Sequence, residues 1–399
     1  MSLYLNALGM VCPLGSTHEA IRARLLAGHS GLRANARYRD AQGAPLALGA
    51  VTDDTLLPAD DHLPLRERSR NNRLALAALE RIRPQVDAAI ARYGAERIGI
   101  VLGTSTSGIA EGEAAFAARA ASGSFPSGYH YGQQELGSPA AALQLTLGTS
   151  GPAYVQSSAC ASSGKAIASA ARLLNMGLCD AVLCGGVDTL CEFTISGFTA
   201  LESVSSEPCN PLSLHRCGIN IGEGAALFLL TREPAPVRLS GWGESSDAYH
   251  ISAPDPEGRG AQLAIGQALR RAGLHAAQID YINLHGTATA QNDAMESRVV
   301  QALFGLEVPV SSTKPFTGHT LGAASAIEAG LCWLLMQDDN PQGLLPPHLW
   351  DGVADPALPP LAPVVVGQCL GRPLQHVLSN SFAFGGSNVA LVFSREENA

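Results

Sequence analysis

The chain has 399 residues, of which 46% are hydrophobic and only 15% are charged, and its formal net charge is −9. This composition is typical of a compact α/β protein with two domains or one large duplicated domain, and it excludes a disordered or coiled-coil chain. The acidic balance argues against a nucleic-acid partner, and because no signal peptide or long apolar span is present, we expect a cytoplasmic protein without membrane contact.

The first distinctive segment along the chain is rich in arginine, although the protein as a whole is acidic. Its arginines are Arg66, Arg68, Arg70, Arg73, Arg81 and Arg83. A solvated helix face is one interpretation of such a charge run. The other is a docking patch for an acidic partner, for which Arg66, Arg68 and Arg70 are the candidates.

The first half of the chain carries predicted buried strands at residues 98–103, 153–158 and 180–186. Cys160 lies between the second of these strands and a helix of small residues at 161–174. Backbone N–H groups and the helix dipole at such a position favour a thiolate and any oxyanion beside it, so Cys160 is a candidate nucleophile. A cysteine that merely packs is the alternative. Because none of the nine cysteines forms a C-x-x-C pair, reduced thiols are expected rather than disulfides or a zinc ribbon.

The second half repeats the pattern of the first. Its predicted elements are strands at 279–284, 308–312 and 389–393 and a small-residue helix at 321–336. Residues 155–158 resemble residues 310–313, and each of these segments precedes a Gly/Ala-rich helix, as expected after duplication of one unit. With a proline-containing link at 231–237, the expected halves are 1–236 and 237–399, each a parallel sheet covered by helices.

Two histidines follow predicted strands of the second half. His285 ends one strand and opens a Gly-Thr-Ala-Thr segment, and His319 precedes the small-residue helix. The carboxyl ends of strands are where α/β proteins gather their sites. A structural or surface histidine is the ordinary alternative for each residue. A metal site is the other alternative, but neither histidine has a second ligand at short spacing, so no metal is expected.

Two charged residues and one glycine-rich turn complete the candidate site. Glu328 lies in a stretch too apolar for a solvated helix face, and a buried carboxylate needs a partner, for which Lys314 is the natural candidate. Residues 380–388 form a glycine turn that enters a strand, which suggests a backbone that approaches a substrate closely.

Short motifs spread over the whole chain carry a specific resemblance. They are Ala7–Gly15, Ser158–Ser162, Cys184–Asp188, Gly222–Ala225, Ser246–His250, His285–Thr289, Lys314–His319 and Phe384–Gly386. Together they resemble the β-ketoacyl-acyl carrier protein synthases, in particular the elongating type I/II enzymes of bacterial fatty acid synthesis. The resemblance implies a thiolase-like α/β fold, with a duplicated βαβαβ core in five αβαβα layers, and normally a dimer.

The resemblance also assigns the catalytic residues. It implies that Cys160 is the acylated nucleophile and that His285 and His319 are the two catalytic histidines. Lys314 resembles the supporting lysine of the family, and Glu328 resembles its partner.

The substrate-binding residues are assigned in the same way. Phe384 resembles the gating phenylalanine, whose backbone N–H joins that of Cys160 in the oxyanion hole. Thr287 and Thr289 resemble the pair that holds the pantetheine arm, and Phe382 is expected to contact the substrate.

The chain departs from the family in two segments. Residues 214–221 replace the usual Arg-Asp-Gly-Phe-type segment, and the hydroxyl-rich residues 104–107 replace an apolar wall of the acyl pocket. We therefore expect the Thr106 hydroxyl to face the acyl chain. Such a wall suits a specialised paralogue, such as a ketosynthase of an aryl polyene pathway, which accepts rigid conjugated chains.

The expected reaction is a decarboxylative Claisen condensation of malonyl-acyl carrier protein with an acyl group on Cys160, in fatty acid, polyketide or polyene elongation. The substrates carry phosphopantetheine, and no other cofactor is expected. The expected partners are an acyl carrier protein and a second ketosynthase chain, as a homodimer or a heterodimer. A non-elongating partner subunit and a cysteine acyl hydrolase are the alternatives, and Cys160 argues against the former.

Overall fold

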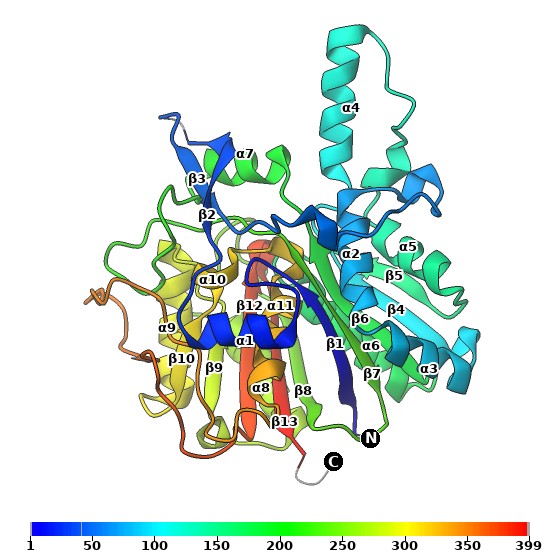
Figure 1. Cartoon of the computed structure of the whole chain (residues 1–399). Coiled ribbons are helices and arrows are strands. Elements are labelled where there is room, and N and C mark those ends of the chain that lie inside the picture. Colours follow the sequence, from blue (N-terminus) through cyan, green and yellow to red (C-terminus); the bar gives the residue numbers. More distant parts are fainter. Residues whose placement is uncertain (1, 41, 397–399) are drawn as a thin grey trace.

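A single large sheet organises the computed structural model, which describes residues 2–40 and 42–396 (Figure 1). The sheet has eleven strands in the order β11-β10-β9-β12-β13-β8-β1-β7-β6-β4-β5. The strands are β1 (Tyr4–Val11), β4 (Ile98–Gly103), β5 (Ala153–Gln156), β6 (Ala181–Asp188), β7 (Gly224–Thr231), β8 (Val237–Ser246), β9 (Tyr281–Leu284), β10 (Pro309–Ser312), β11 (Ala362–Pro363), β12 (His376–Ala383) and β13 (Ser387–Arg395). A separate hairpin consists of β2 (Arg33–Arg39) and β3 (Pro45–Leu48).

The α-helices lie between these strands along the chain, singly or in pairs. They are α1 (His18–Leu26), α2 (Arg70–Glu80), α3 (Arg83–Tyr93), α4 (Ile109–Ser122), α5 (Ser138–Leu147), α6 (Ser162–Asn175), α7 (Glu192–Ala200), α8 (Arg259–Ala272), α9 (Ala290–Phe304), α10 (Lys314–Thr317) and α11 (Ala324–Leu335). No helix among the described residues is long and apolar enough to cross a membrane.

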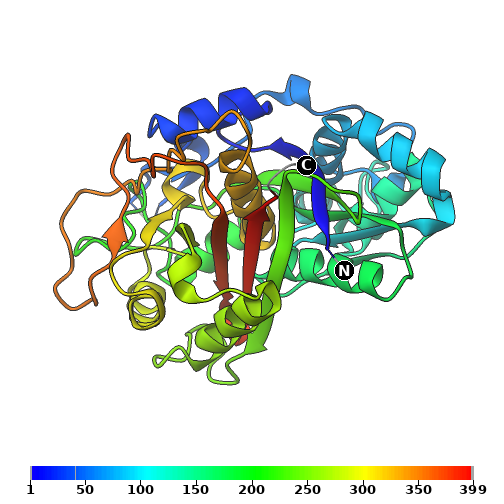
Figure 2. The same ribbon diagram turned by 90° about the horizontal axis from the view of Figure 1, so that it is seen from below.

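The strand order shows the internal duplication. From the middle of the sheet outward, the first half runs β1-β7-β6-β4-β5 and the second runs β8-β13-β12-β9-β10. In each half the three outer strands of this series pair in parallel with one another, whereas the two inner strands form antiparallel pairs. The expectation of purely parallel sheets is therefore corrected to mixed sheets. In the sheet itself, the two halves are linked by one residue pair between β1 and β8, and the view from below shows the halves side by side (Figure 2).

Two helices of small residues occupy the space between the two half-sheets. Every residue of α11 is buried, and α6 is buried along most of its length. A side chain at Gly164 on α6 would meet Val389 at 2.7 Å and Ser325 at 3.1 Å, so glycine allows α6 to approach both β13 and α11 closely. Helices α2 and α5 cover the outer face of the first half, and α8 and α9 cover that of the second. The structure therefore has the five layers of the expected thiolase-like fold.

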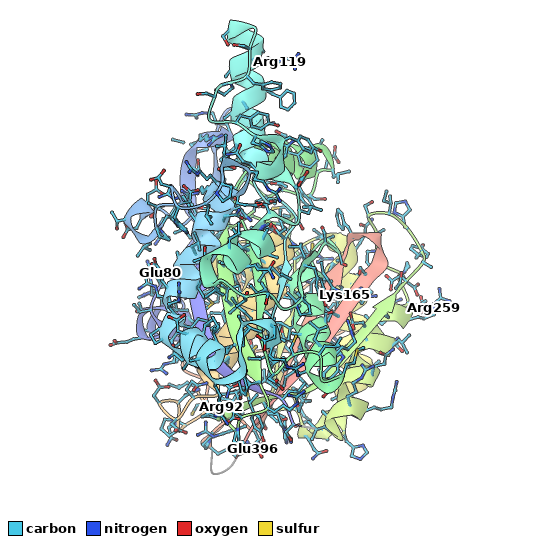
Figure 3. The ribbon with its side chains drawn as sticks, turned by 90° about the vertical axis from the view of Figure 1, so that its right-hand side faces the viewer. Glu80, Arg92, Arg119, Lys165, Arg259 and Glu396 are labelled. Atoms are coloured by element: carbon cyan, nitrogen blue, oxygen red, sulfur yellow. The ribbon has the colours of Figure 1, made fainter. Side chains whose placement is uncertain are left out.

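Two segments extend from this layered body. Helix α4 projects away from the sheet, and Arg119 lies near its tip (Figures 1 and 3). The β2–β3 hairpin packs instead on α7, because Tyr38, Leu46 and Leu48 form one apolar cluster with Ile195 and with Ile221. Ile221 forms an isolated bridge with His319, so the hairpin lies close to a candidate site residue.

Candidate active site

Cys160 lies in a tight turn between β5 and α6, two residues before the helix begins. Ala159 adopts a positive φ of 49°, which is unusual for a residue with a side chain. The Ser162 hydroxyl stabilises the turn by accepting from the Ser158 N–H at 2.8 Å and donating to the Ala159 carbonyl at 2.5 Å. The turn directs the Cys160 side chain into the interior, where it is 5% exposed.

The environment of Cys160 favours the thiol over the thiolate. Burial raises the pKa of the Cys160 thiol to about 12. The charge of Lys314 and the backbone N–H groups of Cys160 and Phe384 act in the opposite direction but do not compensate for burial. Desolvation of the buried thiol thus acts against the thiolate that the helix terminus was expected to supply. A base must take the proton.

His319 is in place to be that base. Its Nε2 atom lies 2.9 Å from the Cys160 Sγ. The His319 backbone is held by its N–H, which donates to Asn220, and by its carbonyl, which accepts from Gly222. Burial and the nearby charge of Lys314 hold the pKa of His319 well below its usual value, so the imidazole is neutral and can accept a proton.

His285 reaches the same cavity from the end of β9. Its ring lies edge-on to that of His319, with centroids 5.5 Å apart. The Lys314 ammonium lies 3.3 Å from the His285 Nδ1 atom and 2.6 Å from a Glu328 carboxylate oxygen. Because an ammonium group only donates, it requires a lone pair on Nδ1 and leaves the His285 proton on Nε2. Burial and Lys314 hold the pKa of His285 well below its usual value.

The Lys314–Glu328 ion pair is almost completely buried, with both side chains at most 3% exposed. Burial raises the pKa of Glu328, and Lys314 opposes that shift. The sequence pattern predicted this pair from the apolar surroundings of Glu328. The structure adds its function within the site, because the same ammonium orients His285.

Two carboxylates on α9 belong to the site, although the sequence interpretation did not include them. Glu296 accepts hydrogen bonds from the backbone N–H groups of His285 at 2.8 Å and Gly286 at 2.7 Å. Asp293 accepts from the backbone of Ala288 at 3.2 Å. Burial raises the pKa of Glu296 to about 7. The sequence did contain a signal for these carboxylates. Two acidic residues lie three positions apart on the helix that follows His285, and this spacing places both on one face of the helix.

The candidate substrate-binding residues converge on the cavity beside Cys160. Thr287, Thr289, Phe382 and Phe384 line it together with Cys160, His285 and His319. The hydroxyls of Thr287 and Thr289 lie 2.8 Å apart, and the Phe384 ring packs on Phe198 with centroids 5.5 Å apart. These side chains therefore surround one cavity next to the Cys160 sulfur.

Thr106 does not have the environment expected from the sequence. Its hydroxyl donates to the buried Asp188 carboxylate at 2.8 Å, and the Thr104 hydroxyl donates to the same oxygen at 2.6 Å. Thr106 is not among the residues that line the cavity. The Thr106 hydroxyl is thus engaged by Asp188, because a buried carboxylate requires hydrogen-bond donors, and a contact between Thr106 and the acyl chain stays a prediction.

The three candidate docking arginines differ in how free their side chains are to bind a partner. Arg70 is bound to Glu223 at 2.9 Å and to Asp54 at 2.7 Å, so it contributes to the structure of this region rather than to a free surface. This corrects the expectation for Arg70. Arg66 has a 60% exposed side chain paired with Glu67. Arg68 is 36% exposed, and docking by Arg66 and Arg68 stays a prediction.

The three residues around the cavity could also serve as metal ligands. One donor atom each from Cys160, His285 and His319 lies within 4.8 Å of the others, and a Cys-His-His set is of the type that binds zinc. The long spacing in the sequence concealed this convergence. The Lys314 ammonium, 3.3 Å from His285, opposes a divalent cation there by charge repulsion.

Comparisons with known proteins agree with this geometry. Residues 5–235 match the family model described as the N-terminal domain of beta-ketoacyl synthase, and residues 237–349 match its C-terminal domain. The chain therefore belongs to the beta-ketoacyl synthase family. It is 31% identical to a 3-oxoacyl-[acyl-carrier-protein] synthase 2 of Synechocystis sp., over 98% of this chain and 97% of the relative. It is 32% identical to nodulation protein E of Rhizobium sp. (strain N33), over 98% of each chain.

Solved structures show the same relationship. The chain is 48% identical, with a TM-score of 0.89, to a chain in the complex of a ketosynthase (ApeO) with its chain length factor (ApeC) from Xenorhabdus doucetiae. That alignment covers 99% of this chain and 98% of the other. A second similar structure is the ishigamide ketosynthase/chain length factor, with 25% identity, a TM-score of 0.88 and coverage of 99% of each chain.

Proposed function

We propose that this member of the beta-ketoacyl synthase family condenses a malonyl unit with an acyl group carried on Cys160. The observation that carries the proposal is the contact of 2.9 Å between His319 Nε2 and Cys160 Sγ, beside a second neutral imidazole held by Lys314. A nucleophile, a base and an oriented N–H donor thus share one buried cavity.

In the first stage, the Cys160 sulfur attacks the carbonyl of an acyl thioester while His319 Nε2 accepts the thiol proton. Backbone N–H groups of Cys160 and Phe384 stabilise the oxyanion of the tetrahedral intermediate. The bond to the carrier sulfur then breaks, and His319 returns the proton to that sulfur. The products are acyl-Cys160 and a free carrier thiol.

In the second stage, malonyl-carrier protein loses CO2, and the electron pair of the broken C–C bond becomes an enolate on the thioester. The Nε2–H of His285 donates to the enolate oxygen. His319 can join it, because its Nδ1 has no hydrogen-bond partner among the described residues and the ring can therefore change tautomer. The carbanion attacks acyl-Cys160, which releases β-ketoacyl-carrier protein and a Cys160 thiolate that takes up a proton. No cofactor besides the carried phosphopantetheine takes part.

We further propose that an acyl carrier protein delivers both substrates and that the chain works as a dimer with itself or with a related chain. The similar structures include a complex with a chain length factor and one of a ketosynthase with an acyl-carrier protein. In this chain β5 is the terminal strand of the sheet and remains partly exposed, so it offers an unpaired edge for a second chain.

The test is product analysis with acyl- and malonyl-carrier proteins, with Cys160→Ala as the matched control. We expect β-ketoacyl-carrier protein and CO2 from the wild type, and an acyl adduct on Cys160 by intact mass. The control should form neither adduct nor β-ketoacyl product but should still release CO2. Free fatty acid instead of condensation product would indicate a hydrolase, and absence of the adduct would indicate a non-elongating subunit.

A further inference from the structure

His348 is a buried histidine outside the cavity, and both of its ring nitrogens are engaged. It is 4% exposed. Its Nδ1 lies 3.1 Å from the Ser312 backbone nitrogen, and its Nε2 lies 2.9 Å from the Pro211 carbonyl oxygen. An N–H requires an acceptor and a carbonyl requires a donor, so the ring must be neutral, with its proton on Nε2. Burial, which lowers the pKa of His348 to about 4, agrees with this state.

The Ser312 N–H needs this acceptor because the neighbouring strand ends early. On one side, β10 pairs with β9 up to Ser312 and Leu284. On the other side, β11 reaches only Pro309 and Val310. The His348 imidazole therefore takes the place of a strand partner at the end of β10. Its own backbone N–H donates to Val364 just beyond β11, which fixes the ring against the same edge.

Ser312 connects His348 to the two segments that carry His285 and Lys314. Its hydroxyl donates to the Gly286 carbonyl at 2.7 Å and accepts from the Lys314 N–H at 3.3 Å. A side chain at Gly286 would meet the Ser312 Cβ atom at 2.5 Å, so the two loops are in close contact. The residue before Gly286 is His285, whose Nδ1 receives the Lys314 ammonium. The position of Ser312 thus sets the spacing between His285 and Lys314.

We propose that His348 is a positioning residue, which holds Ser312 and through it sets the geometry of His285 and Lys314 but not that of Cys160 and His319. The inference rests on the proposed function, in which His285 serves decarboxylation alone, Cys160 is acylated, and His319 takes part in both stages. A histidine that only fills the core would affect both half-reactions through stability. A positioning residue at this place affects decarboxylation selectively.

The test uses two variants, each of which keeps one of the two hydrogen bonds that the His348 ring forms. In His348→Asn the side-chain oxygen can replace Nδ1 as acceptor for the Ser312 N–H. In His348→Gln the amide nitrogen can replace Nε2 as donor to Pro211, but the acceptor is lost. We expect His348→Gln to lower the turnover rate of malonyl-carrier decarboxylation about tenfold or more, with KM and Cys160 acylation unchanged, because small displacements are costly in a preorganised site. We expect His348→Asn to stay within about threefold of the wild type.

A third variant, at another residue, keeps the inference testable if the His348 variants fold poorly. Ser312→Ala retains the backbone N–H bond to His348 but removes both hydroxyl bonds, and it should show the same selective loss of decarboxylation. Equal loss of acylation and decarboxylation, a better rate for Gln than for Asn, or normal decarboxylation in Ser312→Ala would each overturn the inference. A wild type that does not decarboxylate malonyl-carrier protein would instead overturn the proposed function.

Discussion

The two halves of the molecule share a strand order but build their parts of the site by different means. In the first half, the turn between β5 and α6 places Cys160 through backbone geometry and one serine hydroxyl. In the second half, side chains hold one another, with Glu328 bound to Lys314 and Lys314 beside His285. One duplicated fold thus supports a nucleophile that depends on a turn and a set of donors that depends on a buried ionic network.

The same contrast applies to the buried carboxylates. Asp188, at the end of β6, is surrounded by neutral donors, which are the hydroxyls of Thr104 and Thr106 and the N–H groups of Ser105, Thr106 and Gly322. Glu328 has instead a lysine as its partner. Loss of one neutral donor removes a small part of the stabilisation, whereas loss of one ion leaves an uncompensated charge. The second half should therefore be more sensitive to substitution.

The largest expected effect is that of Glu328→Ala, which leaves Lys314 charged and buried without a partner. We expect the free energy of unfolding to fall by about 3–5 kcal/mol and decarboxylation to be lost. The double variant Lys314→Met/Glu328→Leu should recover most of the stability but not the activity, since apolar residues can replace a buried ion pair. Urea unfolding and CO2 release measure the two properties. A fully active double variant would contradict the role of the pair.

The histidine variants should separate the two half-reactions of the site. We expect His285→Ala to lower decarboxylation by about 10²–10³-fold, as for loss of one oxyanion donor. The effect of His285→Ala on Cys160 acylation should be less than tenfold, because His285 takes no part in the proposed acylation step. His319→Ala should slow both reactions, since His319 contacts the thiol at 2.9 Å. Acylation at the wild-type rate in His319→Ala would show that another group takes the proton.

The protonation state of Cys160 can be followed through the pH dependence of its alkylation. Because burial raises the thiol pKa to about 12, the thiolate fraction should grow about tenfold with each pH unit, and iodoacetamide should react about a hundredfold faster at pH 9 than at pH 7. Peptide mass spectrometry separates Cys160 from the exposed Cys217 and Cys369. A plateau below pH 8 would mean that the backbone dipoles do supply a thiolate.

The arginine segment of the first half should show a smaller effect. Arg66→Glu should raise the KM for carrier-bound substrates a few-fold and weaken their salt dependence, with small thioesters unaffected, because an exposed charge acts on encounter rather than on chemistry. Arg70→Glu is the informative contrast. Since Arg70 pairs with the buried Glu223, this reversal should lower stability and affect both substrate types alike. Equal responses to Arg66→Glu would indicate that the segment has no docking role.

The smallest expected effect is that of Thr106→Val, which removes one of several donors to Asp188. We expect a loss of about 1 kcal/mol in unfolding free energy and no change in preference between saturated and conjugated acyl donors. Competition assays with paired acyl-carrier proteins check the preference. A changed preference would restore Thr106 as a residue that contacts the acyl chain.

Sequence patterns were sufficient for features that depend on near neighbours in the chain. The strand and helix around Cys160, the strand ends at His285 and β10, and the buried character of Glu328 all follow from local periodicity and apolar flanks. The repeat of residues 155–158 in residues 310–313 indicated the duplication that the strand order confirms. The family motifs, in turn, identified the residues that the structure gathers around one cavity.

Tertiary structure decided what depends on residues distant in the chain. His319 and Cys160 are 159 positions apart, so their contact and the raised pKa of the thiol arise only when the two halves pack. The Thr106 hydroxyl is bound by Asp188, and Arg70 is bound by Glu223, and neither partner is near in sequence. Burial and long-range pairing set the charge and availability of a side chain, whereas the local pattern sets only its type and its place on an element.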